Sequence, residues 1–530
     1  MKATNEAQFS KNYNILDTVP TVKKHPYITL GLICLTLNFL TRQESRQLVL
    51  PFLEICLFLF VSIIALNYLL KTKEDFVLSQ RGMLVAIPIF AGVFICGTIF
   101  NIHGKGIFWG SFCFLLLLLG IFLLLKYTGR LTLQNSLLLI FITGFAVRII
   151  YAIYTPIGEV SVRQHDVSQF ITQTSPGLIT KFNNYRHSEY IEYIARYLKL
   201  PSADPSVGLS QLYHHPFHHI LSGVLLKLNM KMGMDYKSAC EGIQYLTVFY
   251  SSACMITGYK IFKELGFKGK SLLRGVSLIS LFPWFYVFAG GVNNDILSVA
   301  LGFATILLAI KWYKAPSIKK AFHLALMFGI AMFAKLYMIL LMPAILFVLV
   351  AKWVSVRREN TFGVGELVKS IVAVVGVSLP IGMWWQIKNK ILFGVPLSYA
   401  PTLLKTDSQY VGGRSVLERL FGIEDTIFQN PFVSWKNQNA DYSEYNIFSG
   451  SFKTALFDET TLFSPRGETP WDVIISTIGN FFCVMLGVFF VLLILLSVIS
   501  LFVFLRKKCA EVDKQLFSMV AIVFLTFFAI

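Results

Sequence analysis

The sequence predicts an all-α, polytopic membrane protein with about 12 to 13 transmembrane helices and two long loops on one side of the bilayer. Three observations support this fold class. Of the 530 residues, 55% are hydrophobic and only 14% are charged, which is too little charge to coat a soluble domain. The apolar residues form blocks of about 20, the length that crosses a hydrocarbon core roughly 30 Å thick. Lys and Arg fall mostly in the short turns between these blocks, as they do in membrane proteins with positively charged cytoplasmic turns.

The predicted spans follow the apolar blocks in order along the chain. Their expected bounds are 25–41, 49–70, 82–100, 107–126, 134–155, 239–261, 271–289, 292–313, 319–334, 336–354, 367–387, 475–505 and a last span that begins at 515. Because the chain stops at Ile530 inside the last apolar block, we expect the natural protein to continue beyond this residue.

The distribution of positive charge orients the chain. One set of turns is rich in Lys and Arg, whereas the opposing short turns contain only Arg42, Arg46, Lys105 and Lys335. The rich set and the N-terminus are therefore expected in the cytoplasm. Two long loops, 155–238 and 388–470, then lie outside, and loops of such length are usually functional. The first loop contains an expected amphipathic surface helix at 187–200 and a helix at 218–230 that is too short to span.

Several function classes are excluded by the sequence. The net charge of +18 would suit a nucleic-acid ligand in a soluble protein, but here it follows the turns, so no nucleic-acid partner is expected. Neither GxxxxGK[ST] nor GxGxxG occurs after a strand pattern, so no nucleotide cofactor is expected. Any activated substrate should therefore come from the membrane itself.

Two pairs of polar residues stand where chemistry is expected. His165 and Asp166 follow the fifth span, where a carboxylate can act as a general base with a pKa tuned by the low dielectric. A solvated pair of loop residues is the alternative. Asn294 and Asp295 precede the apolar run of the eighth span, where they would either cap the helix or bind a metal or substrate facing Asp166.

Two cations are predicted near the same plane. Lys335 lies between two apolar spans on the outer side, where its amine would either extend to the membrane interface or bind a phosphate. Arg148 lies in the outer half of the fifth span, and an arginine within an apolar run is a functional candidate by default.

A cluster of histidines occurs in the segment HHPFHH, at His214, His215, His218 and His219. His215 and His219 are four residues apart, so both could face one way on a helix and bind a metal. The HExxH motif is absent. Stacking on a sugar or contact with a phosphate is an equal alternative.

Five segments, in order, resemble the successive motifs of the bacterial glycosyltransferase family 39, which has the GT-C fold and is related to protein O-mannosyltransferases and lipid A aminoarabinose transferases. They are RQHDVSQF (163–170), RHSEYIEYI (186–194), LYHHPFHHIL (212–221), NNDILSVALGFATILLAIKWYK (293–314) and FAKLYMILLMP (333–343). The resemblance extends over residues 135–400. Where that family commonly has two prolines, this sequence has His215 and Pro216, so local contacts there can differ.

The resemblance implies a membrane glycosyltransferase that moves a sugar from a polyprenyl-phosphate donor to a hydroxyl of a glycan, lipid or protein, with inversion. It implies that Asp166 is the general base and that Asp295 helps to hold a divalent metal ion or the donor. Residues expected to bind the substrate or its phosphate are Arg148, Lys335, His165, Tyr337, His214, His215, His219 and Asn294.

The expected organisation follows from the spans and the resemblance. It comprises an N-terminal membrane extension of about four spans (1–133), a catalytic core (134–390) that includes the outer loop 155–238, a second outer loop (391–470) and C-terminal membrane helices (471–530). The expected location is the plasma membrane of a bacterial cell, with the active site outside. Alternatives are a polysaccharide polymerase or ligase, a transporter or flippase for a lipid-linked sugar, and a non-catalytic glycolipid-binding subunit. Ionisable residues at the outer surface, rather than at the bilayer midplane, favour an enzyme over a transporter.

Overall fold

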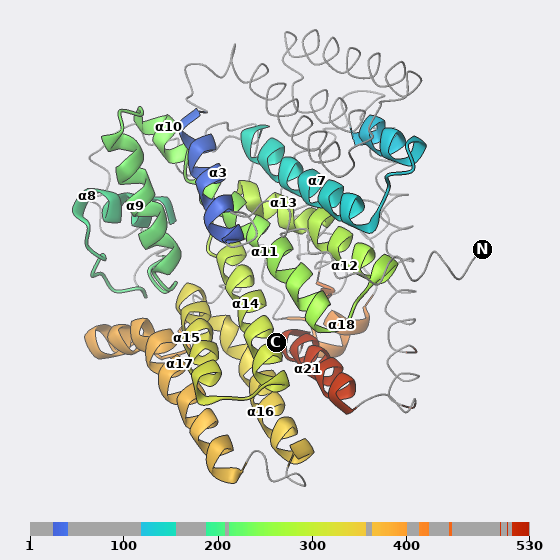
Figure 1. Cartoon of the computed structure of the whole chain (residues 1–530). Coiled ribbons are helices and arrows are strands. Elements are labelled where there is room, and N and C mark those ends of the chain that lie inside the picture. The colour runs from blue at the N-terminus through green and yellow to red at the C-terminus, as the bar shows by residue number, and fades with distance from the viewer. Residues whose placement is uncertain are drawn as a thin grey trace. The chain divides into compact units, whose positions relative to one another are not determined.

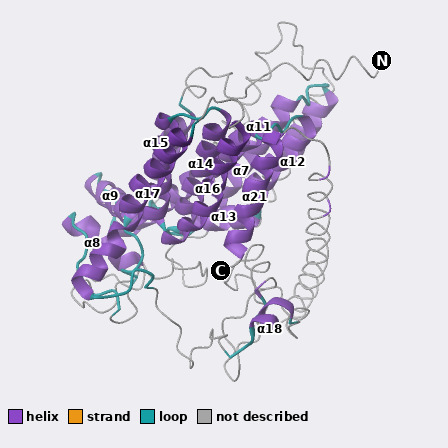
Figure 2. Cartoon of the chain, turned by 90° about the horizontal axis from the view of Figure 1, so that it is seen from below, coloured by secondary structure: helices purple, strands orange, loops and turns teal. Residues whose placement is uncertain are grey.

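The computed structural model describes ten stretches of the chain. They are residues 25–40, 118–154, 187–206, 211–356, 363–399, 413–422, 445–447, 499, 506 and 511–528. Within them the regular elements are helices, and Figure 2 shows helices and loops but no strand in the part described. His165 and Asp166 lie outside the described residues, as do the rest of 155–186, residues 207–210 and most of the second predicted outer loop.

The described residues belong to two compact units. The first combines Met1–Gly158, Ile194–Leu198 and Ile220–Phe303, and the second combines Glu159–Tyr193, Lys199–His219 and Ala304–Ile530. Both units draw on separate stretches of the chain.

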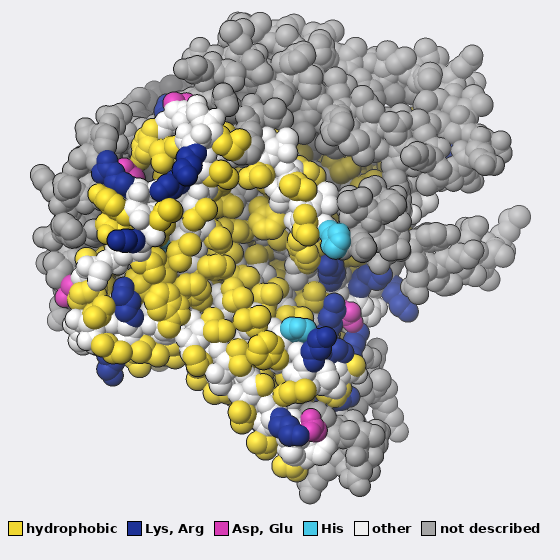
Figure 3. Space-filling view, turned by 60° about the vertical axis from the view of Figure 1, so that its left-hand side comes forward, with side chains coloured by type: hydrophobic (Ala, Val, Ile, Leu, Met, Phe, Trp, Pro, Cys, Tyr) yellow, Lys and Arg dark blue, Asp and Glu magenta, His cyan; other side chains and the backbone are white. Residues whose placement is uncertain are grey.

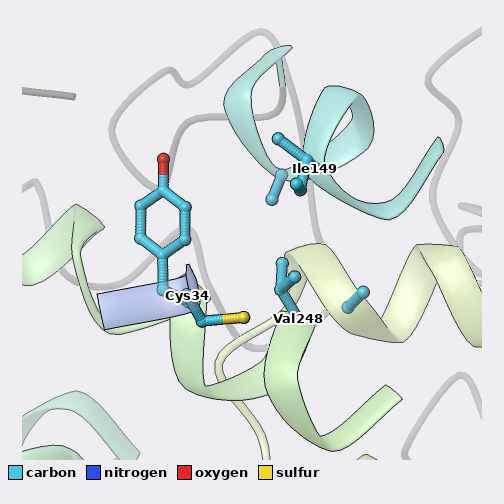
Figure 4. Close-up of a cluster of buried hydrophobic side chains, with 6 residues drawn as sticks. Cys34, Ile149 and Val248 are labelled. Atoms are coloured by element: carbon cyan, nitrogen blue, oxygen red, sulfur yellow. The ribbon is translucent and has the colours of Figure 1, made fainter. Parts of the chain in front are cut away.

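Helices of the first unit pack around α11. The elements are α3 (Pro26–Leu40), α7 (Leu133–Tyr154), most of α9 (Phe217–Lys231), α10 (Tyr236–Glu241), α11 (Gln244–Glu264), α12 (Gly269–Leu281), α13 (Pro283–Gly290) and the start of α14 (Asp295–Lys314). A buried cluster joins α3, α7, α11 and α13, and Figure 4 shows Cys34, Ile149 and Val248 of this cluster turned toward one another. The contact of apolar side chains from four helices is what holds this unit together.

Helices of the second unit pack around the pair α15 and α17. The elements are the start of α8 (His187–Tyr197), the end of α14, α15 (Ile318–Ala334), the 3₁₀ helix η4 (Leu336–Leu341), α16 (Met342–Val356), α17 (Val364–Phe393), α18 (Val416–Phe421) and α21 (Glu511–Phe528).

Small residues allow α15 and α17 to approach closely. A Cβ atom added at Gly382 of α17 would lie 2.5 Å from Cβ of Met332, and one at Gly329 of α15 would lie 3.1 Å from the Ser378 backbone. Such small-residue contacts are typical of helices packed within a membrane. Figure 1 shows the two helices side by side.

Four helical segments are long and apolar enough to cross a bilayer: Gly269–Gly290, Asp295–Lys314, Leu336–Ser355 and Val364–Phe393. On the face shown in Figure 3, hydrophobic side chains cover much of the described surface, and valines such as Val364, Val368 and Val372 of α17 are exposed. An apolar exterior is what lipid requires, so the predicted class of all-α polytopic membrane protein is confirmed.

Two predicted spans are interrupted. The predicted span 239–261 is divided between α10 and α11, and the predicted span 271–289 is divided at Phe282 between α12 and α13. Pro283 explains the second division, because proline cannot donate the backbone hydrogen bond that would continue α12. Hydropathy does not detect such breaks, since the residues on both sides remain apolar.

The predicted surface helix at 187–200 is shorter and more buried than expected. It ends at Tyr197, because Leu198 takes a left-handed conformation with φ of 52°. Tyr190 and Ile191 are fully buried. The apolar face of α8 is therefore covered by protein, not by lipid. The helix predicted at 218–230 is observed as α9.

Candidate functional site

The loop before α9 is fastened to α17 through its backbone. Nε1 of Trp385 donates to the carbonyl of Leu212 at 2.9 Å, and Nε2 of Gln386 donates to the carbonyl of Tyr213 at 3.2 Å. Trp385 is buried. Because two neighbouring side chains hold two successive carbonyls, the histidines that follow are fixed relative to α17.

Five histidines gather at this loop and at the starts of α8 and α9. We call them the histidine cluster: His187, His214, His215, His218 and His219. His187, His215, His218 and His219 are buried, whereas His214 is half-buried. Burial penalises the imidazolium form of such residues.

His187 and His219 share one hydrogen bond. Nδ1 of His187 and Nε2 of His219 are 2.8 Å apart, and the ring planes differ by only 9° with centroids 5.0 Å apart. The rings therefore meet edge to edge, and one nitrogen donates while the other accepts. Tyr190 stacks on His219 with ring centroids 4.2 Å apart. This arrangement ties the start of α8 to the start of α9.

His215 is held on one side only. It donates to the backbone carbonyl of Gly382, while its Nε2 is buried and has no hydrogen-bond partner among the described residues. The ring also meets Phe333 of α15 edge-on. A buried, unpaired imidazole nitrogen carries a desolvation cost of about 1–3 kcal/mol, and in a functional site it is available to a ligand.

Lys335 lies where α15 ends. Its backbone is extended (φ −157°, ψ 128°) and separates α15 from η4. Its Nζ lies 5.1 Å from the ring centre of Tyr337, and its charge acts on His214. The side chain is half-buried. The structure thus brings the predicted residues Lys335, Tyr337 and His214 into one neighbourhood.

Burial controls the titration of the cluster. It lowers the pKa of His215 to about 4 and that of His218 to about 3. It also lowers the pKa of His219 and of His214 well below 6.5, and for His214 the charges of His187 and Lys335 add to the effect. These histidines are neutral at physiological pH and act as hydrogen-bonding groups.

Arg148 has a different environment from the one predicted. In the first unit, its Nε donates to Ser251 Oγ (2.7 Å), its Nη1 to the carbonyls of Gly144 and Ser280 (both 2.7 Å), and its Nη2 to the carbonyl of Ile279 (3.0 Å). The carbonyl of Ile279 would normally bond the residue four positions later, which is Pro283 and has no N–H. Arg148 therefore satisfies carbonyls exposed by the break between α12 and α13.

Asn293 to Asp295 form the start of α14. The Asn293 side chain accepts from the backbone N–H of Asp295 at 3.1 Å, which is an Asx turn that leads into the helix. Asn293 and Asn294 are buried, and Asp295 is half-buried. Across the described residues, no group of three or more His, Cys, Asp or Glu side chains is arranged to hold a metal ion.

Sequence reasoning missed two members of the site. His187 lies 27 positions before His214 in the chain, so only the fold brings the two rings together, with centroids 5.0 Å apart. Trp385 lies inside an apolar span, where the sequence alone indicates only that an aromatic side chain packs against neighbouring helices. A usable signal was the position of His187 at the start of an amphipathic helix with Tyr190 on the same face.

The comparisons with known proteins fit this geometry. Among curated proteins no match is found. Residues 218–384 match the model of the dolichyl-phosphate-mannose-protein mannosyltransferase family, and this stretch includes His218, His219 and Lys335. The predicted resemblance is therefore confirmed over this segment, which is similar to a family of membrane mannosyltransferases.

Proposed function

We propose that this protein transfers a sugar from a polyprenyl-phosphate donor to an acceptor hydroxyl at the extracytoplasmic face of a bacterial plasma membrane, with inversion. The observation that carries the proposal is the position of Lys335, a half-buried cation of the family-matched segment whose charge acts on the uncharged His214. A cation with neutral donors suits a phosphate ester, and the apolar spans suit its lipid tail.

The proposed roles follow from the contacts. Lys335 binds the phosphate of the donor, with the Tyr337 ring against its amine and His214 nearby. His215 and His219 contribute imidazole nitrogens to the same neighbourhood. Asp166, with His165 beside it, is the proposed general base that takes the acceptor's proton. Asn294 and Asp295 remain candidates for contacts with the donor or with a divalent cation.

Arg148 is not part of the proposed phosphate site. Four of the five N–H groups of its guanidinium already donate to protein oxygens. Recruiting it to a phosphate would expose the carbonyls of Ile279 and Ser280 within the bundle, which is costly in an apolar environment. We therefore assign Arg148 a structural role.

The test compares two substitutions with a matched control. Asp166→Asn should abolish transfer from a polyprenyl-phosphate mannose to an endogenous acceptor in membranes. Lys335→Met should reduce kcat/KM for the donor at least tenfold, the loss expected for one charge-assisted contact to a phosphate. Lys319→Met, at the opposite end of α15 and exposed, should leave transfer unchanged. Wild-type transfer by a correctly inserted Asp166→Asn protein contradicts the role of Asp166 as base.

The product distinguishes the alternatives. A transferase of this type adds one sugar to an acceptor, whereas a polymerase or ligase joins whole lipid-linked glycans through the same phosphate chemistry. A flippase moves the donor without breaking the glycosidic bond, so it releases no polyprenyl phosphate in detergent. Release of polyprenyl phosphate together with singly glycosylated product supports the transferase.

A further inference from the structure

His214 differs from the other members of the histidine cluster in its exposure. It is half-buried, while His187, His215, His218 and His219 are buried. Its ring lies against Tyr213, with centroids 4.0 Å apart, and stacks on His187 at 5.0 Å. Tyr213 is held in place by Gln386 through its backbone carbonyl. His214 is therefore the most exposed residue of the histidine cluster, and it lies close enough to Lys335 to feel its charge.

The charged and titratable groups around His214 come from several elements. From α8 comes His187, from α9 and its preceding loop come His215 and His219, and from the end of α15 comes Lys335. Lys388 of α17 lies 4.0 Å from the ring centre of Trp385. Among the described residues, the groups that act on His214 include no carboxylate. The described groups that act on His214 are thus cationic or neutral, and a bound anion would favour the imidazolium.

The proposed reaction changes the charge of the phosphate. In the donor, the phosphate is a diester with one negative charge. A bond forms between the acceptor oxygen and the anomeric carbon, and the bond from that carbon to the phosphate oxygen breaks with its electron pair left on the phosphate. The acceptor's proton passes to the base. The product phosphate is a monoester that carries close to two negative charges above its second pKa of about 6.

We infer that His214 takes up a proton from solvent when the monoester is bound, so that the site prefers the lipid phosphate product over the lipid phosphate-sugar donor. Lys335 alone balances the single charge of the diester, and the imidazolium of His214 balances the second charge of the monoester. This inference rests on the proposed function, because it assigns a product to the same site. It makes His214 a residue that determines which phosphate ester is held, and it links product release to pH.

Binding measurements with two small probes test this inference. Farnesyl phosphate is a monoester, and its methyl diester has the same tail with one charge less. Isothermal titration of the purified full chain at pH 7.5, in buffers of different ionisation enthalpy, counts protons taken up on binding. We expect the binding of farnesyl phosphate to be accompanied by the uptake of about 0.5–1 proton, and the binding of the diester by the uptake of close to none. At this pH the free monoester is already mostly doubly charged, so most of the proton uptake belongs to the protein.

Substitutions locate the proton. His214→Asn should remove the proton uptake and raise the Kd for farnesyl phosphate about tenfold, while the Kd for the diester changes less than about twofold. His214→Gln serves as a second variant if the Asn protein folds poorly. His323→Asn is the control, since His323 is exposed on α15, and it should bind both probes like wild type. Lys335→Met should weaken both probes.

The outcomes distinguish a failure of the inference about His214 from a failure of the proposed phosphate site. If wild type binds both probes but takes up no proton with either, the inference about His214 fails and the proposed phosphate site stands. If proton uptake persists in both His214 variants, the inference fails in the same way. If neither probe binds and Lys335→Met does not change kcat/KM for the donor, the proposed donor site fails together with the inference about His214.

Discussion

The hydrogen bond between His187 and His219 exists only while one of the two facing nitrogens is unprotonated. Nδ1 of His187 and Nε2 of His219 are 2.8 Å apart, and two imidazolium rings would bring two N–H groups against each other. His215 and His218, packed in the same cluster, also have lowered pKa values because of burial. The cluster therefore favours the neutral state in the folded protein.

Acid should unfold the protein through these histidines. Their pKa in the unfolded chain is about 6.5, above the folded values of about 4 for His215 and about 3 for His218. The unfolded chain thus binds protons first, so their contribution to stability is complete above about pH 6.5 and is lost as the pH falls toward the folded values. At pH 5 the expected loss is about 1–2 kcal/mol per histidine.

The measurement is the thermal unfolding midpoint in detergent between pH 8 and pH 5. His218→Asn should flatten this pH dependence relative to wild type, whereas His323→Asn, which changes an exposed histidine, should not. Parallel curves for the wild-type and His218→Asn proteins would show that burial of His218 contributes nothing to acid sensitivity.

At the scale of elements, the contact between α15 and α17 positions the site. Lys335 follows α15, while Trp385 and Gln386 of α17 hold the loop that carries His214. A shift of one helix against the other would therefore separate Lys335 from His214. The close approach at Gly382 and Met332 fixes this relation.

Gly382→Ala should destabilise the protein by about 1–3 kcal/mol, because the added Cβ would lie 2.5 Å from Cβ of Met332 and the helices would have to move apart. Gly376→Ala, in the same helix with nothing within 4 Å of the added Cβ, should be neutral or stabilise by up to about 1 kcal/mol. Unfolding midpoints of both variants, with donor KM as a second readout, check the difference. Equal midpoints would mean that the packing of α15 on α17 is loose at Gly382.

At the scale of the whole molecule, hydropathy predicts most of the described spans to within a few residues. It places the span at 134–155 where α7 runs from Leu133 to Tyr154, and the span at 319–334 where α15 runs from Ile318 to Ala334. It does not resolve the break at Phe282, because apolar residues continue on both sides of Pro283. Of the site, the sequence indicated Lys335 and four of the five histidines. The partner of His219 was not predictable, because the fold alone brings His187 to it.

The role of Arg148 shows why the remaining site predictions needed a structure. A charged residue in an apolar span indicates either a substrate contact or an internal bond, and its sequence position is the same in both cases. Its acceptors include carbonyls more than 130 positions away, so they could not be identified from local spacing.

Arg148 should therefore matter for stability of the first unit rather than for the transfer step. Arg148→Lys retains the charge but has three N–H donors on one nitrogen where four N–H groups on three nitrogens now donate, so at least one bond is lost and the others lose their geometry. We expect a loss of about 2–4 kcal/mol in unfolding free energy, with donor KM unchanged for the protein that remains folded. A specific rise in donor KM at normal stability would instead assign Arg148 to the phosphate site.

The attachment of the loop before α9 has a consequence for which substitutions the loop tolerates. The side chains of Trp385 and Gln386 donate hydrogen bonds to the backbone carbonyl oxygens of Leu212 and Tyr213. Every amino acid has this oxygen. Anchoring at position 213 thus does not depend on the side chain, so a substitution of Tyr213 should change the ring that lies against His214 while the loop stays attached to α17.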